Sequence, residues 1–135
     1  MTPEAEVEAA IERFFLSMDT QDVELMERLV AHDDDMVHIG TDTGEIWRGW
    51  GDLRAATVEQ FEGLEHYKAE IRDLQITLSA SGKVAWYSHL LDARIKSNGS
   101  EREWKGARFT GVFEHRKGKW VMVQTHVSLP ESAQP

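Results

Sequence analysis

The sequence has 135 residues, 41% of them hydrophobic, and a formal net charge of −9 at pH 7. This length suits a single domain, and no apolar run approaches the roughly 18 residues that a transmembrane helix requires. The absence of cysteine excludes disulfide bonds, a thiolate nucleophile and a sulfur-ligated zinc site, and the acidic start, unlike a secretory signal, predicts a cytoplasmic protein.

Charge is divided unevenly along the chain. Residues 1–66 carry 4 Lys/Arg and 17 Asp/Glu, whereas residues 67–135 carry 11 and 7. Most of these charges are expected on solvated faces, but an acidic helical half packed against a mildly basic sheet is electrostatically self-consistent. The densest basic run, residues 116–119, has the composition of a hairpin tip, with no aromatic residue interleaved, so we expect neither a nucleic-acid nor a membrane partner.

Two helices are predicted in the first 31 residues. Thr2 is a suitable N-cap, and Pro3 suits the first helical position of a helix over residues 3–19. Asp22 caps a second helix that ends near residue 31. The apolar face of the first helix follows helical spacing through Val7, Ala10, Ile11, Phe14, Phe15 and Met18.

A small hairpin and a third helix follow. Residues 36–40 and 45–48 are short apolar runs separated by a Thr-Asp-Thr-Gly turn sequence. Asp52 is the expected cap of the third helix, which Gly63 ends.

The second half of the chain predicts a meander of strands. Residues 67–78 also fit a helix, but the turn residues after them favour a strand, and its apolar phase slips by one residue near Asp73, as a β-bulge requires. The remaining strands are expected at residues 83–96, 103–115 and 119–129, with turns at Asn98-Gly99 and Lys117-Gly118.

These elements predict an α+β fold. Three N-terminal helices close the concave face of a curved antiparallel sheet of four main strands, giving a cone-shaped, cystatin-like α+β barrel over residues 1–130, with residues 131–135 as a disordered tail. The open end of the cone is a natural pocket. A large dry cavity is costly, so the pocket should hold water, a ligand or large side chains such as tryptophan.

Five short motifs, in this order, resemble the SnoaL-like branch of the nuclear transport factor 2 superfamily. They are Trp47-Arg48-Gly49, Val84-Ala85-Trp86, Arg108-Phe109-Thr110, Gly118-Lys119-Trp120 and His126-Val127-Ser128. The resemblance covers roughly residues 4–130, and the closing stretch is also similar to the association domain of calcium/calmodulin-dependent protein kinases. It implies a cone-shaped barrel, usually a homodimer, in a superfamily of isomerases, cyclases, dehydratases, hydrolases and non-enzymatic binding domains. Such a fold leaves the function open.

A polar row on the last two strands is one candidate site. Gln124 and His126 share a face of the last strand, and Arg108 lies on its neighbour. If the rows adjoin inside the cone, they form a cationic, hydrogen-bonding patch for a carboxylate or enolate oxygen, with His126 as acid or base. The alternative is that the row lies on the convex face, buried in a dimer interface.

His38 is the second catalytic candidate. It lies on the first short strand, where related enzymes place a general base, and histidine has a suitable ordinary pKa near 6.5. The alternative is a half-buried structural histidine. His89 is expected at a surface or an interface.

Aromatic and apolar residues are expected to line the pocket. If the first helix covers strand 83–96, Trp86 forms an apolar wall with Phe14 and Met18, and Trp47 lies near the mouth.

Three other chemistries fit less well. The first helix has phenylalanines where ketosteroid isomerases use a tyrosine. Asp73, Asp92 and Arg94 offer a hydrolase-like set, but opposite charges on adjacent strands pair routinely without catalysis. The run of residues 33–35 lacks the ligand spacing of a calcium loop, so we expect no metal and no cofactor.

The leading hypothesis is a homodimer, paired through its sheet, that binds a small, partly apolar, anionic molecule. The alternatives are a cofactor-independent lyase or isomerase of the polyketide-cyclase kind, and a pure association module with a filled pocket.

Overall fold

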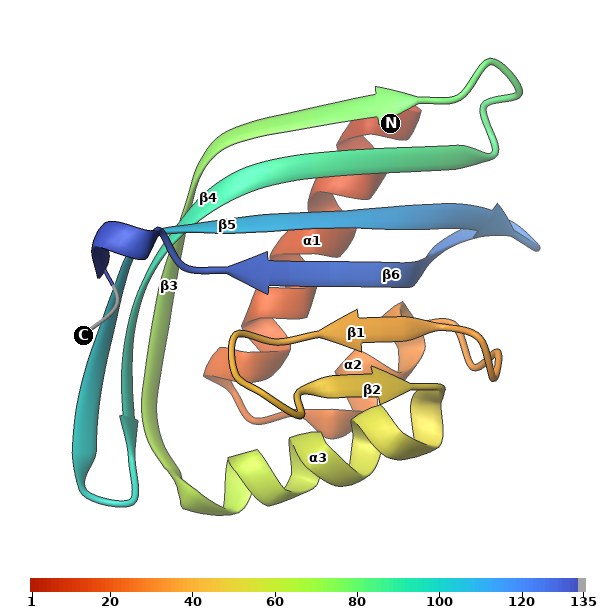
Figure 1. Ribbon diagram of the computed structural model, residues 1–135. Helices are drawn as coiled ribbons and strands as arrows, with labels where there is room; N and C mark the ends of the chain where they lie inside the picture. The colour runs from red at the N-terminus through yellow and green to blue at the C-terminus, as the bar shows by residue number, and fades with distance from the viewer. Residues whose placement is uncertain (134–135) are drawn as a thin grey trace.

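The computed structural model describes residues 1–133. It consists of one curved sheet of six strands with helices on its concave side (Figure 1). The elements in chain order are α1 Pro3–Asp19, α2 Val23–Leu29, β1 Val37–Ile39, β2 Ile46–Arg48, α3 Trp50–Gly63, β3 Leu64–Leu78, β4 Val84–Ser97, β5 Ser100–Arg116, β6 Lys119–Ser128 and a 3₁₀-helix, Glu131–Ala133. The α+β fold class is confirmed.

The first two helices begin at the predicted caps. The Thr2 hydroxyl accepts a hydrogen bond from the Ala5 N–H at 3.1 Å, and the Asp22 carboxylate accepts one from the Leu25 N–H at 3.1 Å. Each bond satisfies a backbone donor that the first helical turn leaves unpaired.

The third helix begins earlier than predicted. Its N-cap is Gly49, which has φ +82°, and Trp50 is already helical. Asp52 is therefore not the cap but an acidic residue of the first turn, where its charge interacts favourably with the helix dipole. Glycine tolerates the left-handed backbone that this entry requires.

The predicted small hairpin extends the main sheet. The strand order is β2-β1-β6-β5-β4-β3, and β1 pairs with β6 in parallel, whereas the other pairs are antiparallel. The sheet therefore has six strands rather than four. Because β2 and β3 are its edges, it is curved but does not close into a barrel.

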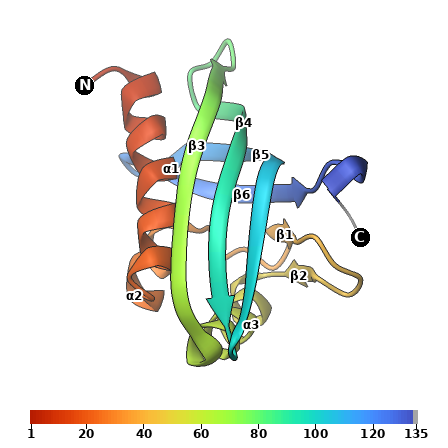
Figure 2. The ribbon, with the colours of Figure 1, turned by 90° about the vertical axis from the view of Figure 1, so that its left-hand side faces the viewer.

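Long strands bend where the register shifts. Asp73 has φ +53°, and the pairing of β3 with β4 slips between Arg72 and Gln75, which confirms the bulge predicted near Asp73. Figure 2 shows β3, β4 and β5 as long curved ribbons, with β6 crossing at their upper end. The bend provides the concave face on which α1 packs.

A further bulge lies in β6. Val112 of β5 pairs with Gln124, but the next residue, Phe113, pairs with Met122, so Val123 is the additional residue. The strict alternation predicted along this strand is therefore wrong. Trp120 and Met122 are buried, and the Trp120 indole donates to the Glu6 carboxylate of α1 at 3.1 Å, whereas His126 is exposed.

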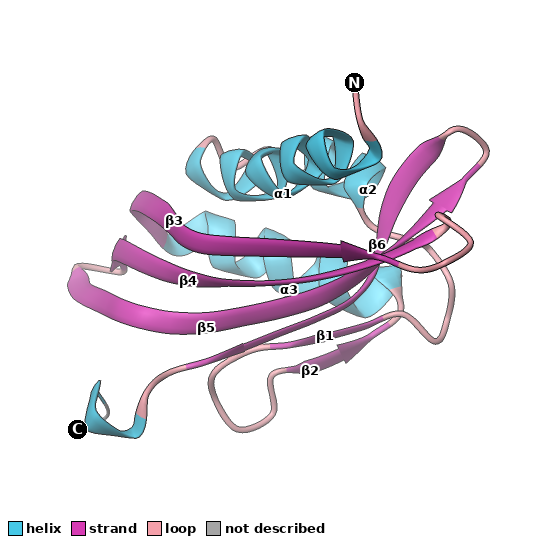
Figure 3. Cartoon of the chain, turned by 90° about the horizontal axis from the view of Figure 1, so that it is seen from above, coloured by secondary structure: helices cyan, strands magenta, loops and turns pink. Residues whose placement is uncertain are grey.

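The core lies between α1 and the concave face of the sheet. Phe14 and Phe15 of α1 both contact the ring of Phe109 on β5, with centroids 6.3 and 5.3 Å apart. Figure 1 shows α1 and α3 both on the inner side of the bend in β3, β4 and β5, and Figure 3 shows α1 alongside β3 when the chain is seen from above. Within residues 1–133, none of the three α-helices covers the opposite, convex face.

At the end of the chain, residues 131–133 form the 3₁₀-helix, and residues 134–135 of the expected disordered tail lie outside the described part. Within residues 1–133, the helices are too short or too polar to cross a bilayer.

Candidate functional site

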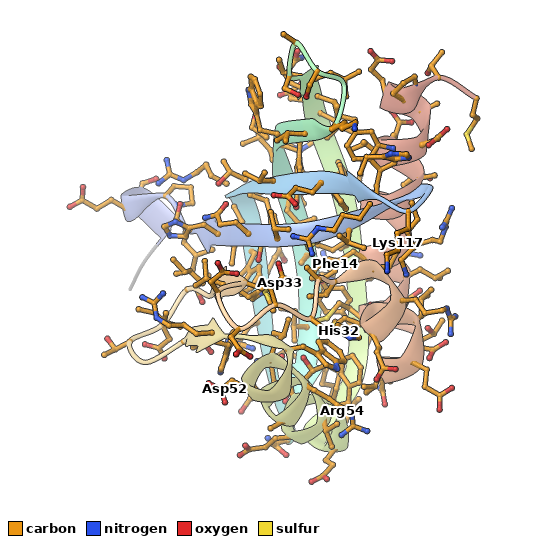
Figure 4. All side chains as sticks on the ribbon, turned by 90° about the vertical axis from the view of Figure 1, so that its right-hand side faces the viewer. Phe14, His32, Asp33, Asp52, Arg54 and Lys117 are labelled. Atoms are coloured by element: carbon orange, nitrogen blue, oxygen red, sulfur yellow. The ribbon has the colours of Figure 1, made fainter. Side chains whose placement is uncertain are left out.

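A cavity of about 290 Å³ lies between the helices and the bent sheet. Its walls come from the three α-helices, the β1–β2 hairpin and the inner faces of β3 to β6. They are mostly apolar: Phe14, Phe15, Met18, Met26, Trp47, Leu53, Phe61, Leu91, Ile95, Trp104, Phe109 and Val127 all contribute. Figure 4 shows Phe14 in the interior and Asp52 and Arg54 on the outer side of α3. A predominantly apolar wall with a few polar groups is typical of small-molecule sites.

Of the histidines in residues 1–133, His38 lines the cavity. It occupies the middle of β1, opposite Thr125 of β6, and its Nδ1 is hydrogen-bonded to the Thr125 hydroxyl. The rings of Phe14 and Trp47 lie 5.9 and 5.8 Å from the imidazole, centroid to centroid. The ring is thus held by strand pairing, one hydrogen bond and two aromatic neighbours.

Burial determines the charge of His38. It lowers the pKa of the imidazole from its ordinary 6.5 to about 4, because an apolar site disfavours the charged form. His38 is therefore neutral at pH 7, which makes it a weaker general base than a histidine with a pKa near 7.

Two charged residues also line the cavity, one of each sign. Glu45, in the loop of the β1–β2 hairpin, accepts a hydrogen bond from the Asp42 N–H at 2.9 Å. Arg102, which pairs with Ile95 across β5 and β4, is exposed. Among the lining residues the formal charges therefore cancel.

The family model for the SnoaL-like domain matches residues 7–132. The chain belongs to the SnoaL-like domain family. The match covers nearly the whole chain and confirms the resemblance inferred from its motifs.

Solved structures share the fold of this SnoaL-like domain at low sequence identity. A nuclear transport factor 2-like superfamily protein from Salmonella enterica serovar Typhimurium is 18% identical with a TM-score of 0.83, covering 95% of this chain and 91% of its own. An uncharacterised protein with a cystatin-like fold from Caulobacter vibrioides is 17% identical with a TM-score of 0.78, over 96% and 90%.

A third similar structure comes from Xanthomonas campestris and is described as a "Putative calcium/calmodulin dependent protein kinase II association domain". It is 21% identical, with a TM-score of 0.77, and covers 93% of this chain and 86% of its own. The comparison with curated proteins returned no match. At these identities the neighbours show the fold alone, and the nuclear transport factor 2-like and cystatin-like descriptions agree with the predicted class.

The polar row of this SnoaL-like domain lies on the convex face. Thr110 pairs with His126, and Arg108 pairs with Ser128, whose hydroxyl accepts from the Arg108 Nε at 3.1 Å. Arg108 and His126 are exposed, Gln124 is half-buried, and none of these three lines the cavity. Their neighbours along the strands, Phe109 and Val127, face inward and line the cavity. The polar row therefore lies on the convex face and not inside the cone.

Trp86 also lies outside the cavity, with 48% of its surface exposed. It alternates with the buried Ala85 and Tyr87 on β4, so the wall predicted from Trp86, Phe14 and Met18 is wrong in its tryptophan. Phe14, Met18 and Trp47 do line the cavity. Trp104 lines the cavity as well. It lies three residues from the inward-facing Ala107, a spacing that regular alternation would place on the opposite face, but the register shifts between Leu91 and Ala93 beside Gly106, which has φ +69°.

His89 is buried rather than at a surface, so that prediction is wrong. Its ring is parallel to those of Phe109 and Tyr87, at 5.2 and 5.9 Å between centroids, and Phe15 meets it edge-on at 5.5 Å. Nδ1 of His89 is hydrogen-bonded to the Leu90 carbonyl at 3.0 Å, and burial lowers the pKa of the His89 imidazole. The alternation of β4 contained this signal, because His89 is in phase with Leu91 and Tyr87.

The remaining charged candidates form pairs on the surface. Arg72 donates two hydrogen bonds to Asp92, at 2.7 and 3.0 Å, and the Gly106 N–H donates a third at 2.8 Å. Arg116 binds the Asp33 carboxylate through two nitrogens at 2.8 Å each. Within residues 1–133, no group of three or more His, Asp or Glu side chains is placed to hold a metal ion.

Proposed function

We propose that this SnoaL-like domain binds a small, partly apolar molecule in the cavity around His38. The observation that carries the proposal is the cavity of about 290 Å³ with apolar walls and a few inward polar groups. This volume is close to the lower end of the range of small-molecule sites, roughly 300 to 1,000 Å³. The anionic ligand character inferred from Arg108 has lost its basis, because that residue lies on the convex face; Arg102 is the cation beside the cavity, and Glu45 balances it.

A cofactor-independent lyase or isomerase is the second candidate, and it now depends on His38 alone, since His126 is outside. The low pKa of His38 weakens its action as a general base, which favours binding over this chemistry. The cytoplasmic location remains part of the proposal and depends on the cysteine-free, acidic sequence.

A cavity-filling substitution tests the binding site. Ala56 of α3 lines the cavity, whereas its neighbour Ala55 is exposed and does not. We expect a panel of aromatic and alicyclic ketones and carboxylic acids to include compounds that raise the melting temperature, because a ligand at 100 times its Kd adds about 2.7 kcal/mol of stability. Ala56→Phe should abolish these shifts and Ala55→Phe should preserve them. Equal shifts in both variants, or no shift with any compound, would contradict the proposal.

We also propose a homodimer paired through the convex face. Its support is the exposed Trp86, beside the half-buried Leu90 and Val112, on a sheet face without a helix. Apolar side chains that remain exposed together on one face are typical of an interaction surface.

Trp86→Glu is expected to convert the dimer to a monomer in sedimentation velocity, with the association weakened by about thirtyfold or more, as for a central aromatic anchor. Leu16→Glu is the matched control, because Leu16 is exposed to a similar extent, 47%, but lies on α1. Dissociation by Leu16→Glu and not by Trp86→Glu would place the interface elsewhere, and a monomeric parent protein would refute the dimer.

A further inference from the structure

The hydroxyl of Thr125 contacts one of the two ring nitrogens of His38, Nδ1. Thr125 is 1% exposed, and within the described chain the hydrogen-bond partner of its hydroxyl is Nδ1 of His38. A hydroxyl has one proton to donate, and a buried donor without an acceptor is strongly unfavourable. The Thr125 O–H therefore donates, and Nδ1 accepts through its lone pair.

The second nitrogen of His38 follows from the first. No carboxylate of residues 1–133 pairs with this imidazole, and burial keeps it neutral. A neutral imidazole with an unprotonated Nδ1 carries its proton on Nε2. His38 is thus a hydrogen-bond donor at Nε2, and the lone pair of its Nδ1 is occupied by the hydrogen bond from the Thr125 hydroxyl.

Nε2 of His38 is open to the cavity. In the described part of the chain, the fully buried side-chain nitrogen without a hydrogen-bond partner is Nε2 of His89. Nε2 of His38 is not among such atoms, so it is not fully buried. His38 lines the cavity, and its Nε2 has no hydrogen-bond partner within residues 1–133. Since Nδ1 is directed to β6, Nε2 is directed away from that strand and is available to a bound molecule.

We propose that His38 donates a hydrogen bond from Nε2 to the carbonyl oxygen of a neutral ring-containing ligand, and that Thr125 is the positioning residue that fixes this tautomer. The inference rests on the proposed binding function. A neutral acceptor suits a neutral donor in a cavity whose lining charges cancel, and the rings of Phe14 and Trp47 beside His38 suit a flat, apolar ligand body.

The tautomer is tested without any ligand. Long-range ¹H–¹⁵N correlation spectra distinguish a protonated Nε2 from a protonated Nδ1, and His38→Phe identifies the His38 signals. We expect a protonated Nε2 and an unprotonated Nδ1 near pH 7. Thr125→Ser should keep this pattern, and Thr125→Val should lose it. A protonated Nδ1 in the parent protein would overturn the inference, whatever the result for binding.

The ligand class is tested with a matched pair of probes, 2-acetylnaphthalene and 2-ethylnaphthalene, which differ at the carbonyl group. The measured quantity is the affinity for the ketone divided by the affinity for the hydrocarbon. We expect this ratio to be about fivefold to tenfold higher in the parent protein than in His38→Phe, which is the effect of one hydrogen bond. Thr125→Ser should keep that ratio, and Thr125→Val should reduce it. An unchanged ratio in His38→Phe would refute the donor role. Failure of both probes to bind would count against the ligand class and the proposed function together, while the tautomer spectrum would still decide the role of Thr125.

Discussion

Gly111→Ala is expected to lower the free energy of unfolding by about 3 kcal/mol, because the added methyl group overpacks the core. Gly111 is buried on β5, between Tyr87 of β4 and Thr125 of β6. A Cβ at this position would lie 2.6 Å from two ring carbons of Tyr87 and still nearer its hydroxyl oxygen. The ring cannot easily move away, since Tyr87 is 3% exposed and packs on Phe113 at 5.4 Å.

Urea unfolding of Gly111→Ala and of a control measures this effect. Gly51→Ala is the control, because its added Cβ meets no atom within 4 Å; its stability should remain within about 0.5 kcal/mol of the parent protein or rise slightly. Adding Tyr87→Leu to Gly111→Ala should recover part of the loss by removing the rigid ring. A Gly111→Ala protein as stable as the parent would contradict this prediction, because the ring of Tyr87 would then move aside without cost.

Stability should fall with acidification because of His38. Its pKa is about 4 in the folded protein and near 6.5 when unfolded, so between these values the unfolded chain binds the proton more tightly. The contribution is fully present above about pH 7, decreases below pH 6.5 and levels off below pH 4. The difference between the two pKa values corresponds to roughly 3 kcal/mol. Glu45 and Arg102 line the same cavity but form no ion pair with His38 in the described structure.

The measurement is denaturant unfolding at several pH values between about 8 and 4, compared with His38→Phe, which lacks this titration. The difference between the two curves isolates His38 from the carboxylates, which titrate in both proteins. His126→Gln, which replaces an exposed histidine outside the cavity, controls for the removal of a histidine in general. Parallel curves for the parent protein and His38→Phe would show that the buried imidazole does not titrate as proposed. His89, whose pKa burial also lowers, acts in the same direction in both proteins.

The elements of the fold were predictable because their signals are local. Thr2 and Asp22 cap helices through hydrogen bonds within one turn, and glycine at positions 99 and 118 supplies the left-handed backbone of two tight turns. The bulge at Asp73 was also visible, because the apolar phase changes within a single strand. Each of these features depends on neighbours within a few residues.

The candidate site was less predictable because it depends on which face of each strand is inside. The bulge at Val123 places Trp120 on the helix side and His126 on the outside, which strict alternation cannot represent. Trp86 and Trp104 both lie on long strands of the sheet, but Trp86 is outside the cavity and Trp104 lines it, because the register of β4 and β5 shifts beside Gly106. The partner of His38 was not foreseeable either, since the parallel pairing of β1 with β6 is not encoded near β1.

The pairing of β1 with β6 has a consequence for how the chain acquires its cavity. His38 and Thr125 are 87 positions apart, and Thr125 lies on β6, the last strand in chain order, which is central in the sheet. Contacts that close so long a loop form late and at an entropic cost. Because Val127 of β6 lines the cavity, its wall is complete only when β6 has paired with β1, and we expect binding at this site to require the fully folded molecule.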